Sequence, residues 1–127
     1  MGHFLIKAKL PSMNEFISAM NNNRHAGNQF KKDIQETIGW YIKQALSAHT
    51  LRPFGEKSCV VYIEWHESTK RRDVDNIQSA QKFIMDALQD QKVIKRDSRK
   101  YVKQIYHEVV DDKEDFVFVR MLPDECH

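Results

Sequence analysis

The sequence predicts one α+β domain in which helices pack on a mixed β-sheet, with elements in the order β-α-β-α-β-β. Two segments carry apolar residues at helical spacing, and short segments rich in β-branched and aromatic residues lie before, between and after them. The chain has 127 residues, of which 41% are hydrophobic, which suits the single core of one domain. We therefore expect residues 1–127 to form one domain.

The first half of the chain reads as a strand, a loop and a helix. Residues 3–10 partly alternate between apolar and polar side chains and stop at a proline, which is typical of a strand. Residues 11–29 contain three consecutive asparagines and a glycine, so we expect a mobile loop there. From residue 28 to about residue 49, apolar residues recur at intervals of three, four and seven, which predicts a helix.

The second half reads as a strand, a helix and two strands. Residues 58–66 are β-branched and aromatic, which predicts a largely buried strand, and residues 75–90 are amphipathic at helical spacing. Residues 100–110 and 115–122 are strand-like and flank a turn-like "DDKE", so we expect a hairpin. Helices between strands imply crossover connections, and the hairpin would add an antiparallel pair, so the sheet should be mixed. Three aromatic side chains of these strands are expected in the core: Trp65, Phe116 and Phe118.

The charges and cysteines of the chain indicate its possible partners and its cellular compartment. The formal net charge is only +2, but residues 92–103 hold six cations and one acid, a tract that can follow a phosphate backbone or form a solvated face. Cys59 and Cys126 lie far apart and outside any metal-binding spacing, so we expect free thiols in a reducing compartment. No leader opens the chain and no apolar run approaches ~18 residues. We expect a soluble, cytoplasmic protein without membrane contact.

The segment "KRRDVDNIQSAQKFIMDALQD", residues 70–90, carries the candidate chemistry. Asp73 and Asp75 would point to the same side of an extended chain, where their carboxylates repel each other. A hard divalent cation with oxygen ligands would relieve that repulsion. An aspartate can equally cap the helix that follows, and three preceding cations can neutralise the acids, so a structural role stays open: Lys70, Arg71 and Arg72.

The helix predicted from Asp75 onward has a polar face. Each residue of a helix advances ~100° around its axis, so Ser79, Lys82 and Asp86 would share the face of Asp75, away from the apolar stripe. Helical side chains lean toward the N-terminus. We therefore expect Lys82 to reach back toward the two aspartates.

Together, "RRDVDN", "KFIMDAL" and "VIKRDS" resemble the signature of the RusA family of Holliday junction resolvases, and "LPSMN", residues 10–14, looks like its P-x-x-N element. The family's lysine usually stands three residues after the asparagine, where this chain has Ser79. Lys82 keeps the four-residue step to the aspartate of D-A-L, which implies three extra residues that lengthen the helix. Either Lys82 or Ser79 fills the family position. Arg96 stands where the family often has a second acid.

The resemblance implies an endodeoxyribonuclease that resolves Holliday junctions by paired symmetric nicks in DNA recombination and repair. It would act as a homodimer on four-way junction or branched DNA, with Mg²⁺ as cofactor and Mn²⁺ as a substitute, in a bacterium or phage. Asp73, Asp75 and Asp97 would bind the metal, Lys82 would stabilise charge in the transition state, and Asp86 would support the site. The residues implied in DNA binding are Lys70, Arg71, Arg72, Asn14, Asn76, Lys95, Arg96 and Arg99.

Two other functions stay open on the residues alone. One is a metal-dependent nuclease of other branched DNA, because selectivity for DNA shape depends on dimer geometry and the basic surface rather than on the catalytic residues. The other is a non-catalytic DNA-binding module in which the acids cap helices and pair with cations. Loss of cleavage with retained binding on Asp75→Asn would distinguish an enzyme from such a module.

Overall fold

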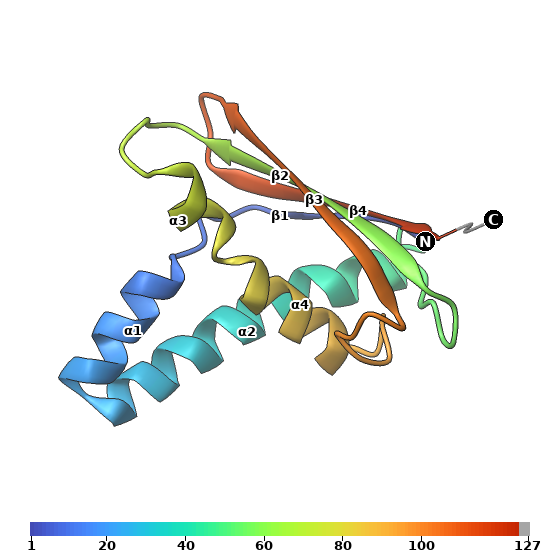
Figure 1. Cartoon of the computed structure of the whole chain (residues 1–127), viewed down its shortest axis with the longest axis horizontal. Coiled ribbons are helices and arrows are strands. Elements are labelled where there is room, and N and C mark those ends of the chain that lie inside the picture. The colour runs from blue at the N-terminus through green and yellow to red at the C-terminus, as the bar shows by residue number, and fades with distance from the viewer. Residues whose placement is uncertain (125–127) are drawn as a thin grey trace.

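Four strands form one mixed sheet in the order β1-β4-β2-β3 in the computed structural model, which describes residues 1–124 (Figure 1). β4 is antiparallel to both β1 and β2, whereas β2 and β3 are parallel. The bounds of the strands are β1 Gly2–Ile6, β2 Cys59–Glu67, β3 Val102–Asp111 and β4 Phe116–Pro123. The predicted fold class, a small α+β domain with helices on a mixed sheet, is confirmed.

The predicted hairpin between residues 100–110 and 115–122 is wrong, because β2 lies between β3 and β4. Tyr62 of β2 is the register partner of Tyr106 on one side and of Arg120 on the other. Insertion of β2 gives its backbone N–H and C=O groups partners on both sides, as a strand with one fully buried face requires. The "DDKE" segment therefore connects two strands that do not pair.

The predicted loop over residues 11–29 is also wrong, because two helices occupy most of it. Helix α1 spans Met13–Asn22 and α2 spans Arg24–Ser47. Ser12 caps α1 by accepting a hydrogen bond from the Glu15 N–H at 3.2 Å, and Asn23 caps α2 through the Ala26 N–H at 3.1 Å. The asparagine run thus supplies the boundary between two helices, because a side-chain oxygen at an N-cap satisfies a free N–H of the first turn.

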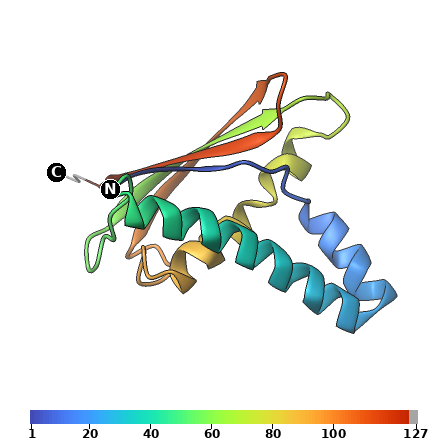
Figure 2. The same ribbon diagram turned by 180° about the vertical axis from the view of Figure 1, so that it is seen from behind.

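All four helices of residues 1–124 lie on one face of the sheet, as Figures 1 and 2 show from opposite sides. Strand β2 alternates, so that Val61, Ile63 and Trp65 face these helices and are buried. The core also takes apolar side chains from α2 and from α4, which spans Gln81–Asp90. Each such aliphatic or aromatic side chain contributes ~1.5–3 kcal/mol on burial. No helix within residues 1–124 is long and apolar enough to cross a membrane.

Candidate functional site

Two segments that are more than 60 residues apart in sequence meet beside the end of β2. The Asn14 Nδ2 donates to the Asn76 Oδ1 at 2.7 Å, and the Met13 N–H donates to the Ser79 Oγ at 3.0 Å. The Arg72 Nη1 donates to the Leu10 carbonyl at 2.8 Å. The "LPSMN" and "RRDVDN" segments, chosen separately from the sequence, are therefore neighbours in space.

Arg72 is held by a second partner, Glu67, the last residue of β2. The Arg72 Nε and Nη2 donate to the two carboxylate oxygens of Glu67 at 3.0 and 2.7 Å, and the side chains are only 13% and 5% exposed. A buried carboxylate is tolerated only when a cation and hydrogen bonds satisfy it. This geometry fixes the backbone immediately before Asp73. Arg72 thus holds this segment in the structure, and its predicted contact with DNA stays a prediction.

The helix predicted over residues 75–90 is interrupted. Helix α3 covers only Val74–Gln78, and α4 begins at Gln81. Between them Ser79 donates its hydroxyl to the Asn76 carbonyl at 2.6 Å and accepts the Met13 N–H. A serine hydroxyl that bonds to nearby backbone competes with helix continuation. The continuous polar face expected from Asp75 to Asp86 therefore does not exist, and the residues around Ser79 form a break instead of an extension.

Asp73 and Asp75 are exposed at the start of α3. Asp73 occupies the N-cap position, with the extended backbone of a cap (φ −72°, ψ 154°). Within the described residues, however, its carboxylate accepts no capping hydrogen bond. Asp75 lies in the first turn, where its charge complements the positive end of the helix dipole. The N-cap position explains the backbone conformation of Asp73. Its carboxylate, which makes no capping hydrogen bond, stays available to a ligand.

Lys82 does not reach back toward these aspartates as predicted. Its Nζ lies 3.0 Å from the Asp86 Oδ1, one turn further along α4, with side chains 58% and 24% exposed. The hydrogen bond to Asp86 raises the pKa of Lys82, and the charges of Asp86 and Asp97 raise it further. Lys82 thus pairs with Asp86 of its own helix rather than with Asp73 or Asp75.

Asp97 lies in the connection between α4 and β3, where its N–H donates to the Gln89 side chain at 3.0 Å. Gln89 is in the last turn of α4, whereas Asp73 and Asp75 lie at the start of α3, before the first turn of α4. A ten-residue helix is ~15 Å long. Accordingly, no three His, Cys, Asp or Glu side chains within residues 1–124 are gathered to hold a metal ion. The structure does not bring the three predicted ligands together.

The remaining predicted DNA contacts lie at both ends of this α3–α4 segment. Lys70 is exposed and lies 3.8 Å from the Asp111 carboxylate, and Lys95 pairs with Glu56. Three arginines at these ends are exposed: Arg71, Arg96 and Arg99. Exposed ion pairs contribute only ~0–1 kcal/mol, so Lys70 and Lys95 can exchange their carboxylates for phosphates.

Two polar contacts of the buried sheet face escaped the sequence reasoning. Glu67 has a signal in the sequence, since the alternation that buries Trp65 also buries Glu67, and an acid there needs a cation. The second is His107, whose Nδ1 accepts from the Trp65 Nε1 at 2.9 Å while its Nε2 lies 2.7 Å from the Gln81 Oε1. Burial lowers the pKa of His107. These contacts join β2 and β3 to the start of α4.

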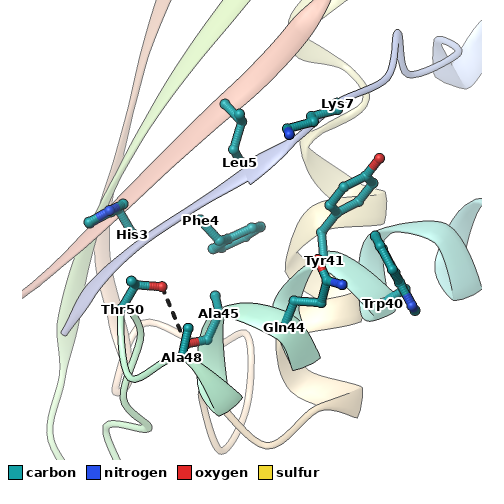
Figure 3. Close-up of a pocket in the computed structure, with 10 residues that line it drawn as sticks. All are labelled: His3, Phe4, Leu5, Lys7, Trp40, Tyr41, Gln44, Ala45, Ala48 and Thr50. Atoms are coloured by element: carbon teal, nitrogen blue, oxygen red, sulfur yellow. Dashed lines mark hydrogen bonds between the residues drawn. The ribbon is translucent and has the colours of Figure 1, made fainter.

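A pocket of about 420 Å³ lies between β1 and α2 (Figure 3). Figure 3 shows Trp40 and Tyr41 along one side, with Phe4 of β1 and Lys7, which follows β1, on the other. None of the site residues predicted from the sequence lines it, and its lining carries no carboxylate. We therefore place the candidate site at α3 and α4. No family model and no curated protein matches the chain.

Proposed function

We propose that this chain is a Mg²⁺-dependent endodeoxyribonuclease that cuts four-way junctions by paired symmetric nicks, acting as a homodimer in the cytoplasm of a bacterium or in phage infection. One observation supports it most. The hydrogen bonds from Asn14 to Asn76 and from Arg72 to Leu10 join the two motif segments and fix the chain on both sides of Asp73 and Asp75. Both carboxylates stay exposed.

The donor set at the start of α3 fits Mg²⁺. This ion prefers carboxylate oxygens, keeps several waters and is commonly held by only one or two carboxylates. Asp73 and Asp75 would hold it, and Asp73 offers a carboxylate that no helix N–H occupies. Asp97 joins them only if residues 91–101 move or a second chain supplies it. When bound, Mg²⁺ supplies an activated water and stabilises the developing negative charge on phosphate.

Lys82 and the exposed cations act on the DNA. The ammonium of Lys82 is held by Asp86 in an exposed ion pair, which a phosphate oxygen can replace at little cost. A positioned charge of this kind contributes ~2–4 kcal/mol to the stabilisation of a transition state. Basic side chains at both ends of α3–α4 attract the DNA backbone toward the acidic pair, which would otherwise repel it: Lys70, Arg71, Lys95, Arg96 and Arg99.

The decisive experiment compares a four-way junction, a flap and a duplex of matched sequence, incubated with the purified protein and MgCl₂ or MnCl₂. We expect paired nicks in the junction, little cutting of duplex and no cutting after EDTA treatment. Equal cutting of all three DNAs would support the alternative, a metal-dependent nuclease of other branched DNA. Binding of the junction with no cutting in either metal would contradict the nuclease proposal.

The dispersed carboxylates within residues 1–124 favour one further candidate, a non-catalytic DNA-binding module. In that case Asp73 and Asp75 would only balance the charges of their neighbours. The Asp75→Asn variant separates the two functions. An enzyme loses cleavage and keeps or tightens junction binding because a negative charge is removed, whereas a binding module has no cleavage to lose.

A further inference from the structure

The face of the sheet opposite the helices carries an apolar surface that nothing within residues 1–124 covers (Figures 1 and 2). Strand alternation and register place every second side chain of the four strands on this open face. Seven apolar or aromatic members of this face come from β2, β3 and β4: Val60, Tyr62, Tyr106, Val110, Phe116, Phe118 and Leu122.

These side chains are more exposed than a folded monomer requires. Tyr106 is 50% exposed and Leu122 is 39% exposed, and Tyr62 stacks on Tyr106 with ring centres 5.0 Å apart. Phe116 and Phe118, expected in the core, are only half-buried here, so that prediction is wrong. Contiguous exposed apolar patches larger than a few hundred Å² mark interaction surfaces. From strand spacing and rise, the whole open face, charged side chains included, covers roughly 450 Å² in projection, so its apolar part is smaller.

The charges on the open face select among possible partners. Glu64 and Glu108 are register partners on β2 and β3, and the Glu64 Oε1 also lies 3.1 Å from the His66 Nε2 on the same face. Arg120 and His3 are register partners on β4 and β1. Two carboxylates against one arginine do not suit a nucleic acid, because phosphates need a cationic surface. A surface with an acidic half and a basic half is complementary to a copy of itself.

We propose that the open face is the interface between two copies of this chain. A twofold axis parallel to the strands, between β2 and β4, would lay β2 of one copy over β4 of the other and β3 over β1. Sheets packed face to face lie ~10 Å apart. The half with Glu64 and Glu108 would then cover the half with Arg120, with Glu64 two residues along the strands from Arg120 of the other copy. The aromatic side chains would interdigitate at the centre.

The projected area of the open face, roughly 450 Å², is close to that of the smaller specific interfaces, which bury less than ~600 Å² per partner. The side chains that protrude from the face add accessible surface to this projection. The choice of a second copy rests in part on the proposed function, since paired nicks need two sites. In this arrangement the helices, with α3 and α4 among them, lie on the outer faces of the pair and stay open to DNA.

Sedimentation velocity of the full chain tests this proposal. We expect the wild type to sediment as a dimer and Tyr106→Glu/Leu122→Glu to sediment as a folded monomer, with an unchanged far-ultraviolet circular dichroism spectrum. Trp40→Glu is the matched control, because Trp40 is 54% exposed on α2. This variant should stay dimeric. A monomeric wild type, or a dimer that the Trp40 variant loses and the open-face variant keeps, would overturn the proposal.

A charge exchange tests the orientation of the two copies. Restoration of dimerisation by a second substitution would also show that the first variant is folded. Arg120→Glu should raise the dimer dissociation constant at least tenfold, and adding Glu64→Arg to the same chain should restore most of the loss. Failure of the second substitution to restore dimerisation would overturn the charge pairing. Junction cleavage is assayed separately. A dimer that does not cut contradicts only the proposed nuclease activity, whereas a monomer that cuts contradicts the interface and the proposed homodimer but not the nuclease activity.

Discussion

The Arg72 guanidinium contacts both carboxylate oxygens of Glu67 and also the Leu10 carbonyl, so one side chain joins the end of β2 to the segments before α1 and α3. Because Asp73 follows Arg72 directly, this contact fixes the backbone that presents the acidic pair.

Arg72→Met should lower the free energy of unfolding by ~3–5 kcal/mol, because it leaves the Glu67 carboxylate buried without a cation. Urea denaturation monitored by circular dichroism measures the change. The neighbouring Arg71 is exposed, and Arg71→Met should stay within ~0.5 kcal/mol of wild type. Equal stabilities of the two variants would show that the Arg72 pair does not form in solution.

The acidic pair should be expendable for folding and required for cleavage. Asp73→Asn removes a charge but no capping hydrogen bond, so we expect the free energy of unfolding to change by less than ~0.5 kcal/mol. We expect both Asp73→Asn and Asp75→Asn to abolish Mg²⁺-dependent junction cleavage, measured on labelled strands, while gel-shift affinity in EDTA is kept. If Asp73→Asn cleaves at the wild-type rate, Asp73 is not part of the catalytic site.

Ser79 and Lys82 should separate stability from activity. Ser79→Ala loses the acceptor of the Met13 N–H and should cost ~1 kcal/mol in unfolding free energy. Its cleavage rate per folded molecule should stay within about threefold of wild type. Lys82→Ala should keep its stability within ~1 kcal/mol, because its ion pair is exposed, and should lose ~10²–10³ in cleavage rate. The reverse pattern would make Ser79 the functional residue.

His107 should make stability depend on pH. Burial lowers its pKa below 6.5, so the folded chain holds it neutral while the unfolded chain takes up a proton as the pH falls through 6.5. Stability from this residue is therefore fully present above 6.5 and is lost as the pH falls toward the folded pKa. Urea denaturation at pH 7.5 and 5.0 should show a smaller loss in His107→Gln than in wild type. His25→Gln, exposed on α2, should behave as wild type.

The elements were predictable where one local pattern dominates. Strand β2 and helix α2 follow from β-branched density and helical spacing, and the fold class follows from their alternation. The pairing of β3 with β2 was not predictable. Register and strand order depend on which faces of the strands the helices cover, and the local sequence does not determine this. Helix α1 begins at "SMNE", which matches the capping pattern, but its asparagine run is also typical of a turn, so local sequence does not decide between helix and loop there.

The candidate site was predictable in part. The motif residues led to two segments that do touch, through Asn14 and Asn76. The break at Ser79 was not foreseen, since it depends on the Met13 N–H, which comes from a distant helix. The prediction that Lys82 reaches back toward Asp73 and Asp75 is wrong, because the direction of its side chain depends on Asp86 and on where α4 begins. The structure of residues 1–124 does not bring Asp97 together with the acidic pair, so a metal ligand at Asp97 stays a proposal that needs a movement of residues 91–101 or a second chain.

The central place of β4 has a consequence for how the chain acquires its fold during synthesis. β4 separates β1 from β2, and its pairing joins Gly2 to Met121. A nascent chain that has completed only β1, β2 and β3 therefore lacks the strand that links β1 to the rest of the sheet. Contacts of such high contact order form slowly and leave strand edges exposed while they form. We expect folding to complete only after translation has passed β4, with chaperone binding to the unfinished sheet before then.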